Sequence, residues 1–295
     1  MLHSELFSLV HYVWTHPLNA KGKLSAISRL IRWQIGNRLL PGLVALPYVG
    51  TTSLFAKRGM SGATGNWYCG LHEVNEMAFV LHVLRSSDHF VDVGANVGSY
   101  TVLAAGGVGA HVTAVEPIPS TFQSLSRNVL LNGLTELVRC WQGGLSNMNT
   151  VLRFTTGLDC VNHVLAEHEV LPSVEVPVTT LDELVGRDVP TLIKIDVEGH
   201  ELAVLRGAQR VLASPKLLAL IMETNGSGAR YGIDDEELIE DLSHYGFTPY
   251  SYEPFSRTLS VGVSKSGNTV FVRDHLEVMR RVTAAPTFKL VNGSI

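Results

Sequence analysis

From residue 73 onward, short apolar runs alternate with longer segments of helical periodicity. The apolar runs are bounded by Gly, Pro, Ser or Asp, and they predict strands over 90–94, 111–116, 137–142, 191–196, 217–223, 247–252 and 268–273. The segments around them predict helices over 73–84, 98–106, 119–131, 198–212 and 234–245. Strands that alternate with helices are typical of a mostly parallel sheet with helices on both faces. The last two strands are joined by a loop without a helix, so we expect them to close one edge of the sheet as an antiparallel pair.

The first part of the chain has a different pattern. A helix over 24–39 carries its apolar residues on one face, with Arg29, Arg32 and Arg38 away from the centre of that face. The apolar positions are Leu24, Ile27, Leu30, Ile31, Ile35 and Leu39. We expect this face to pack on the flank of the α/β domain. The alternatives are peripheral contact of residues 21–40 with an anionic membrane surface, and a homo-oligomer.

The Gly, Pro and Thr content of residues 41–71 predicts a loop. We therefore divide the chain into a basic helical N-terminal extension, residues 1–72, and one α/β domain, residues 73–295. Charge supports this division, because residues 1–60 hold seven Lys and Arg and one acid, whereas the remainder holds 16 basic and 26 acidic residues. An acidic domain is a poor surface for a phosphate backbone, so we do not expect nucleic acid as a substrate.

Two further features of composition bear on location. The three cysteines form no C-x-x-C pair, which favours a reducing compartment over a disulfide framework or a zinc site. The sequence contains no apolar stretch of the length that spans a bilayer. We therefore expect a cytoplasmic protein.

Residues 89–100 combine a buried strand with a glycine turn and the start of a helix. Asp92 lies at the carboxyl end of the strand, where open α/β sheets bind their ligands. Gly94 and Gly98 lack a Cβ, so the backbone can adopt positive φ angles and approach a ligand closely. The dinucleotide motif G-x-G-x-x-G would need two further glycines, one of them at Asn96, so the segment does not favour an NAD-binding oxidoreductase. By itself it is equally compatible with an ordinary turn between a strand and a helix.

Two further acids follow the ends of predicted strands. Glu116 ends the second strand, 22 residues after Gly94, where an acid can accept hydrogen bonds from the ribose hydroxyls of an adenosine-containing ligand. Asp196 ends the fourth parallel strand and is followed by Val-Glu-Gly-His. Because the carboxyl ends of parallel strands meet at one edge of a sheet, both acids are candidates for the same cleft.

Taken in order, four segments resemble the FkbM family of S-adenosylmethionine-dependent O-methyltransferases: V-D-V-G-A-N-V-G-S-Y (91–100), A-V-E-P (114–117), V-T-T-L-D-E-L (178–184) and I-K-I-D-V-E-G-H-E (193–201). The resemblance covers roughly residues 73–275 and leaves the extension outside. It implies a Rossmann-like class I methyltransferase fold, an α/β fold with a mostly parallel seven-stranded sheet and an antiparallel edge strand. It also implies that S-adenosyl-L-methionine is held by Asp92, Gly94, Asn96, Gly98, Glu116, Gly143 and Asp196.

The resemblance also implies which part of the cofactor each of these residues contacts. The segment from Asp92 to Gly98 would line the methionine and ribose end of the cofactor, and Glu116 would hold the ribose. Gly143, in the run Gln142–Leu145 that follows the third strand, would lie near the adenine.

Methyl transfer to an oxygen needs alignment of donor and acceptor and removal of the hydroxyl proton. Asp196, beside the expected cofactor cleft, is placed for that work. His200 follows one helical turn later, and its ordinary pKa of about 6.5 suits a general base near neutrality. The alternative is a histidine on the helix surface.

A magnesium site is a further hypothesis. Asp196, Glu223 and Asn225 end neighbouring strands, as the magnesium ligands do in catechol-type O-methyltransferases, although E-x-N replaces a D-N pair. Oxygen donors of this kind suit Mg²⁺. We favour the alternative in which Glu223 positions the substrate without an ion.

The acceptor is expected to meet the insertion 156–173, which is longer than an ordinary connection between the third and fourth parallel strands. His163 or His168 would contact the acceptor there. For each histidine we favour the alternative, a solvated position on a surface hairpin between strands 150–155 and 174–179. The loop 253–262 is a second candidate wall.

These expectations converge on S-adenosylmethionine-dependent O-methylation of a hydroxyl on a small-molecule or glycan acceptor, such as a sugar, a glycolipid or a natural product. The alternatives are a carboxylate or peptide acceptor, an NAD-binding oxidoreductase, and a non-catalytic module that binds S-adenosylmethionine.

Overall fold

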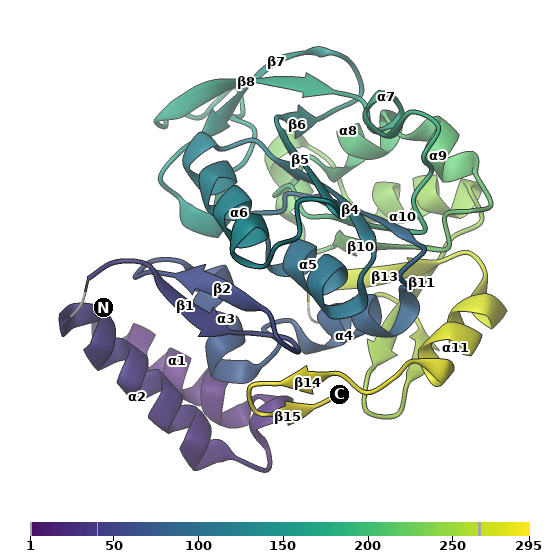
Figure 1. The fold of residues 1–295 in the computed structure, drawn as a ribbon. Helices are drawn as coiled ribbons and strands as arrows, with labels where there is room; N and C mark the ends of the chain where they lie inside the picture. The colour runs from purple at the N-terminus through teal and green to yellow at the C-terminus, as the bar shows by residue number, and fades with distance from the viewer. Residues whose placement is uncertain (1, 40, 265–266) are drawn as a thin grey trace.

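An eight-stranded sheet forms the centre of the molecule (Figure 1). The computed structural model describes residues 2–39, 41–264 and 267–295. The sheet has the strand order β12-β11-β13-β10-β9-β3-β4-β5. Its strands are β3 (His89–Val93), β4 (His111–Glu116), β5 (Val138–Gln142), β9 (Leu192–Ile195), β10 (Ala219–Glu223), β11 (Thr248–Glu253), β12 (Thr258–Val261) and β13 (Asn268–Val272).

Strands β5, β4, β3, β9 and β10 pair in parallel, as the alternation of strands and helices predicts. The central strands are buried throughout, which explains why they read as continuous apolar runs. The predicted antiparallel pair of terminal strands is confirmed, and β13 lies between β10 and β11 rather than outside them. An eighth strand, β12, lies within the expected loop and pairs with β11.

Helices cover both faces of this sheet (Figure 1). They are α4 (Val74–Val83), α5 (Ser99–Val102) with its π-helical continuation η2 (Leu103–Val108), α6 (Pro119–Leu131), α7 (Leu181–Val185), α8 (Glu201–Arg206), α9 (Gln209–Ala213), α10 (Asp235–His244) and α11 (His275–Ala284). The helix predicted over 198–212 is thus two short helices. Gly207, between them, packs so closely on the Ser146 carbonyl that a Cβ would lie 2.1 Å from its oxygen.

A small three-stranded sheet lies beyond β5. It consists of β6 (Gly144–Leu145), β8 (Ser173–Thr179) and β7 (Thr150–Thr155), in that order. Strands β7 and β8 pair antiparallel, which confirms the predicted hairpin around the insertion. The insertion itself contains the short helix η3 (Asp159–Val161).

The N-terminal region is more structured than its sequence predicts. It contains α1 (Leu2–Thr15), η1 (Pro17–Asn19), α2 (Lys23–Leu39), β1 (Val44–Pro47), β2 (Ser53–Ala56) and α3 (Ser61–Cys69). The prediction of a loop over 41–71 is therefore wrong. The backbone N–H groups of Ser53 and Phe55 donate to the side chains of Asn132, which caps the C-terminal end of α6, and Asn128 on α6. Distant residues therefore stabilise the β1–β2 hairpin.

Helix α2 packs with a face that is rotated from the one expected, so that only Ile27 and Leu30 of the expected apolar face contact the core. Its buried residues are Ala26, Arg29, Leu30 and Trp33, whereas Leu24, Ile31, Ile35 and Leu39 are exposed. Arg29 explains this orientation. Its guanidinium donates to the carbonyls of Trp67 and Tyr68 at the C-terminal end of α3, which have no partners within that helix. The prediction that the apolar face packs on the domain is therefore wrong for these four residues.

One hydrophobic core joins the N-terminal region to the sheet, and it runs from Val13 through Phe79 to Leu290. The last short strands, β14 (Lys289–Leu290) and β15 (Gly293–Ser294), lie against the first residues, because the Asn292 side chain donates to the Leu18 carbonyl. The domain boundary at residue 72 stays a prediction. Among the residues that the structure describes, no helix has the length and apolar character needed to cross a bilayer.

Candidate active site

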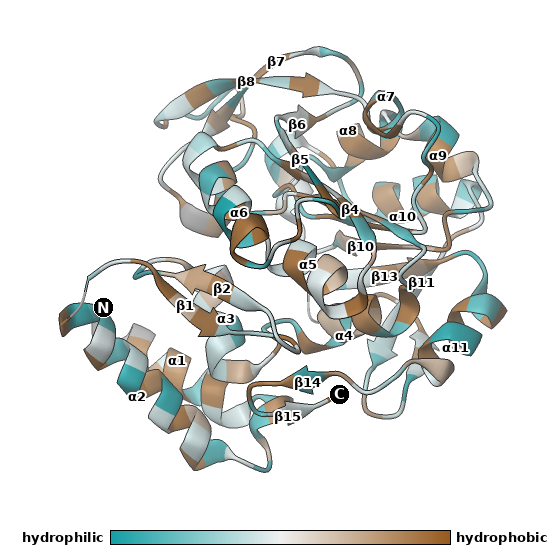
Figure 2. Ribbon diagram, in the orientation of Figure 1, coloured by the Kyte–Doolittle hydropathy of each residue, from teal (hydrophilic) through white to brown (hydrophobic). Residues whose placement is uncertain are grey.

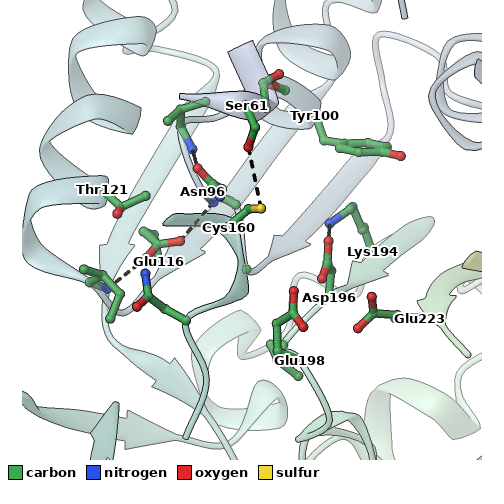
Figure 3. Close-up of a pocket in the computed structure, with 18 of the residues that line it drawn as sticks. Ser61, Asn96, Tyr100, Glu116, Thr121, Cys160, Lys194, Asp196, Glu198 and Glu223 are labelled. Atoms are coloured by element: carbon green, nitrogen blue, oxygen red, sulfur yellow. Dashed lines mark hydrogen bonds and ion pairs between the residues drawn. The ribbon is translucent and has the colours of Figure 1, made fainter. Parts of the chain in front are cut away.

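A pocket of about 220 Å³ opens at the carboxyl ends of β3, β4, β9 and β10. This is the position where open parallel sheets bind their ligands. Figure 3 shows two groups of side chains in the pocket, Glu116 with Asn96 and Thr121 in one group and Lys194 with three carboxylates in the other. The pocket therefore has two chemically distinct sides.

The turn between β3 and α5 forms the first side. Gly94 has a φ of 76°, and a Cβ there would lie 1.9 Å from the Asp196 carbonyl oxygen, so only glycine fits. The backbone N–H groups of residues 94–98 all donate to oxygen atoms of the protein itself. A turn that binds a pyrophosphate leaves such groups free for the ligand. The turn therefore suits a ligand that is not a phosphate.

Glu116 connects this turn to the end of β4. Its Oε2 accepts from the N–H of Asn96 and its Oε1 from the N–H of Ile118, each at 2.9 Å. Each carboxylate oxygen has a second lone pair, so the carboxylate can still accept hydrogen bonds from a vicinal diol such as a ribose. Burial raises the pKa of Glu116 to about 7, although both N–H groups oppose that shift.

Asp92 lies behind the turn and not in the pocket wall. Its Oδ2 accepts from the Thr101 hydroxyl at 2.6 Å, and its Oδ1 is buried without a partner. Burial raises the pKa of Asp92. Its predicted direct contact with the cofactor stays a prediction, and the described geometry places its carboxylate beneath the turn.

Three carboxylates form the second side of the pocket. Oxygen atoms of Asp196, Glu198 and Glu223 lie within 4.8 Å of one another. Lys194 of β9 donates to Oδ2 of Asp196, the residue that follows this strand, at 2.7 Å and lies over the ring of Tyr100. The end of β9 therefore supplies both the carboxylate and a positive charge that offsets it.

The turn Val197–Gly199 presents Glu198 to this cluster. Glu198 has a φ of 56°, an uncommon value for a residue other than glycine, and its carbonyl accepts from Arg230. The buried carboxylate of Glu201 accepts from the N–H groups of Val197 and Gly199. These contacts stabilise the strained conformation, which is a pattern found at functional sites.

Burial and mutual repulsion raise the pKa values of two carboxyl groups in the cluster. The pKa of Glu223 rises to about 8, through burial first and then through Asp196 and Glu198. The pKa of Glu198 rises to about 7, through burial and then Asp196. Groups that titrate near neutral pH can exchange protons with a substrate under physiological conditions.

The structure separates other predicted residues from the pocket. His200 does not line it; its Nε2 is 3.1 Å from the Ser146 hydroxyl, and burial lowers the pKa of His200 to about 4. Gly143 lies between β5 and β6, against the ring of Trp141. Asn225 is exposed and donates to Glu223 at 2.6 Å, whereas Glu198 takes the third position in the carboxylate cluster. The roles predicted for these residues stay predictions that their positions do not support.

The insertion forms part of the pocket wall, as expected. Cys160 and Asn162 line the pocket, together with Phe154 of β7. His163 is buried and 3.1 Å from a carboxylate oxygen of Glu169, so the solvated position favoured for this histidine is wrong.

The other two expectations for the acceptor wall have different outcomes. His168 is exposed, as the favoured alternative states. None of the residues in the loop 253–262 lines the pocket. Instead, Arg257 of that loop donates to backbone carbonyls that follow α11.

Sequence reasoning missed several residues of the pocket. Lys194 reads as one more position of a buried strand, and Glu198 reads as the first residue of a helix. Ser61 and Gly62 reach the pocket from α3, in the segment where a loop was expected. For Lys194 a signal existed, because a lysine inside an apolar strand is rare unless its charge is paired.

The pocket fits a ligand that carries positive charge. Five carboxylates line it, from Glu73, Glu116, Asp196, Glu198 and Glu223, against one lysine. The sulfonium and amino groups of S-adenosylmethionine match this charge, and its ribose matches the free lone pairs of Glu116. The same acidic lining is unsuited to a phosphate.

Comparison with known proteins agrees with this geometry. A family model described as "Methyltransferase FkbM domain" matches residues 92–249, more than half of the chain. A hexuronic acid methyltransferase, AglP, from Haloferax volcanii is 29% identical over 176 residues, which cover 58% of this chain and 68% of the relative.

Solved structures show weaker similarity. The FkbM methyltransferase from Methylobacillus flagellatus is 19% identical, with a TM-score of 0.44, and the match covers 72% of this chain but only 52% of that one. An RNA methyltransferase from Salinibacter ruber, in complex with S-adenosylhomocysteine, is 14% identical with a TM-score of 0.33, over 68% of this chain and 90% of that one. Neither similarity carries an argument about substrate.

The family assignment therefore rests on the matched domain and agrees with the strand order of the sheet and with the acidic, sulfonium-compatible pocket at its carboxyl edge. The chain belongs to the FkbM family of methyltransferases and is an S-adenosylmethionine-dependent methyltransferase.

Proposed function

We propose that this enzyme transfers a methyl group to a hydroxyl of a sugar, carried by a glycan, a glycolipid or a natural product. The observation that carries the proposal is the cluster of Asp196, Glu198 and Glu223 opposite the Glu116 side of the pocket. Carboxylates are acceptors for the several hydroxyls that a sugar presents. The name of the Haloferax volcanii relative also refers to a sugar acid, although it covers only part of this chain.

The residues of the cluster have separate roles in this proposal. When bound, S-adenosylmethionine supplies a methyl group on a sulfonium, which is open to attack by an oxygen. Asp196, held by Lys194, orients the acceptor hydroxyl. Glu223 accepts the proton that this hydroxyl loses, because its pKa of about 8 lies close to neutral pH. Glu198 adjoins Glu223 and shares in its titration.

Charge favours a hydroxyl over a carboxylate as the acceptor. A carboxylate at the acceptor position would approach three acids with one lysine nearby, and like charges in a partly buried site repel strongly. A hexuronic acid offers both kinds of oxygen, so the relative's name does not distinguish them.

We propose further that no divalent ion is required. Three carboxylates within 4.8 Å are suitable ligands for Mg²⁺. However, Lys194 already pairs with Asp196, and Asn225 donates to Glu223 through the nitrogen of its amide. We expect turnover to be unchanged by EDTA, whereas loss of turnover that Mg²⁺ restores would assign the cluster to the metal.

The deciding experiment measures release of S-adenosylhomocysteine with neutral glycans, uronic-acid glycans and their methyl esters as acceptors. We expect turnover of hydroxyl acceptors, and loss of turnover in Glu223→Gln but not in Glu240→Gln, an exposed control on α10. Mass spectrometry then distinguishes an alkali-stable ether from an alkali-labile ester. An ester product would replace the hydroxyl with the carboxylate, and cofactor binding without any turnover would favour a non-catalytic module.

A further inference from the structure

Helix α2 carries an apolar stripe on its solvent-facing side. Leu24, Ile31, Ile35 and Leu39 are 79%, 51%, 55% and 74% exposed. At about 100° of rotation per residue these four positions fall within an arc of roughly 80°. The opposite face of the helix is the one that packs on α3 through Arg29. The stripe is therefore not needed to hold α2 on the rest of the molecule, because the opposite face already does so.

Positive charges border this stripe. Arg32 and Arg38 are exposed and fall just outside its two edges, about 20° from each. Lys23 lies 5.1 Å from the centre of the ring of Trp14, which is itself 41% exposed on α1. The sequence has no Asp or Glu between Leu6 and His72, and Glu5 is the single acid before Glu73, so basic residues predominate in this region. Figure 2 shows brown and teal segments alternating along α2, as this arrangement requires.

A second copy of the chain is a poor partner for such a face. A symmetric dimer places the same patch of both subunits against each other, so Arg32 and Arg38 would meet the same two arginines. An anionic lipid surface, by contrast, offers apolar depth for the stripe and negative charge for its borders. Tryptophan and lysine side chains are also favoured at the boundary between lipid and water.

We propose that the outward face of α2, formed by Leu24, Ile31, Ile35 and Leu39 with Arg32 and Arg38, binds peripherally to the surface of an anionic lipid bilayer. The helix lies in the plane of the interface and does not cross it, in agreement with the lack of a membrane-crossing helix among the described residues. This inference does not depend on which acceptor is methylated.

The contact has a consequence for the pocket. Helix α3 packs against α2 at its C-terminal end, through Arg29, and its N-terminal residues Ser61 and Gly62 line the pocket. At about 1.5 Å per residue this nine-residue helix spans roughly 14 Å. A bilayer bound to α2 would therefore hold the pocket at a fixed, short distance from the lipid surface.

The test is co-sedimentation of the full chain with vesicles of phosphatidylcholine alone and of phosphatidylcholine mixed equally with phosphatidylglycerol. We expect binding to the anionic vesicles that weakens as salt is raised. Ile31→Ser/Ile35→Ser and Arg32→Gln/Arg38→Gln should each weaken it by about tenfold. The matched control is Leu276→Ser/Arg280→Gln on α11, where the leucine is 82% exposed and the arginine side chain 71%. Thermal melting and S-adenosylmethionine binding establish that each variant is folded.

Three results would overturn the proposal. The first is equal binding to neutral and anionic vesicles, and the second is the absence of binding to either. The third is a dimer, seen by sedimentation velocity without lipid, that Ile31→Ser/Ile35→Ser dissociates, because the stripe would then be covered by a second copy.

Discussion

The ammonium nitrogen of Lys194 lies 2.7 Å from Oδ2 of Asp196, two residues along the same strand end. Burial by itself lowers the pKa of a lysine, but the carboxylates of Asp196, Asp92 and Glu73 outweigh it and raise the pKa of Lys194 above its usual range. Lys194 is thus a permanent positive charge beneath an acidic pocket. Without it, Asp196 would lose its ion-pair partner.

Removal of this charge should destabilise the fold. Lys194→Met leaves Asp196 without its partner, and breaking such a pair costs about 3 kcal/mol, the lower end of the usual range because Asp196 is partly exposed. Urea denaturation measures the loss. Lys194→Met/Asp196→Asn should recover most of the stability but no methyl transfer. Equal stability of the single and double variants would show that the pair does not act as a unit.

Glu223→Gln tests the proton acceptor. In the unmodified enzyme, kcat should rise with pH through an apparent pKa of 7 to 8, as the carboxyl pair of Glu198 and Glu223 ionises. The substitution should lower kcat by about 10²–10⁴-fold and remove that rise. The pH profile distinguishes this role from a structural one. An unchanged profile in the variant would transfer the role to another group.

The cluster also predicts how stability depends on pH. The pKa values of Glu116, Glu198 and Glu223 are raised above the 4.5 of an unfolded chain. Burial lowers the pKa values of His16, His82 and His200 to about 4, so these histidines have the opposite effect below about pH 6.5. Between about pH 6.5 and 8 the carboxyl groups decide, and the folded state binds more protons than the unfolded state. The free energy of unfolding without ligand should therefore fall as pH rises through this window.

A series of thermal melts measures this dependence. We expect Tm to drop by about 3 °C between pH 6.5 and 8.5, which corresponds to roughly 2 kcal/mol in a chain of this size. Glu198→Gln/Glu223→Gln should reduce the drop. A Tm that rises with pH, or a drop that the double variant leaves intact, would contradict the assignment of these carboxyl groups.

Glu116→Ala should weaken cofactor binding. The substitution removes the acceptor for the N–H groups of Asn96 and Ile118 and for the ribose hydroxyls. Loss of hydrogen bonds to a charged group costs about 1.5–3 kcal/mol, which corresponds to a rise in Kd of roughly 10- to 150-fold. Calorimetry with S-adenosylhomocysteine measures this. Glu136→Ala, beyond the far end of β5, serves as a control that should bind normally.

Gly199→Ala tests the turn that presents Glu198. Gly199 has a φ of 104°, and a Cβ there would lie 2.6 Å from the carbonyl oxygen of Ser227. We expect a loss of stability greater than that of Gly226→Ala, where φ is 80° but the space around a Cβ is open, so that only the backbone cost of about 1–2 kcal/mol applies. Thermal melts compare the two. Equal losses would show that the Ser227 contact is dispensable.

Much of the central sheet follows from the sequence because its strands are buried on both faces and read as continuous apolar runs. The N-terminal hairpin does not follow, because its strands have four residues each and their stabilising partners, Asn128 and Asn132, lie more than 70 positions away. The orientation of α2 fails for a related reason. Hydrophobic periodicity assigns Arg29 to solvent, whereas the unpaired carbonyls of another helix bind it in the interior.

In the site, too, some residues could be predicted from the sequence and others could not. Strand ends place Glu116, Asp196 and Glu223 at one edge, and the structure brings all three to the pocket. His200 differs, because helical spacing gives its position along the chain but not the direction of its ring, which points to Ser146. Glu198 was missed because its positive φ turns the side chain toward the cluster, and no periodicity encodes that angle.

The contact between the backbone of Gly94 and the Asp196 carbonyl joins the turn between β3 and α5 to the end of β9 without any side chain. Directed evolution toward other acceptors is therefore best confined to a segment that borders the pocket but takes no part in this contact, namely the insertion around Asn162. Libraries in that segment would alter the choice of substrate while methyl-donor affinity is inherited unchanged from the parent enzyme.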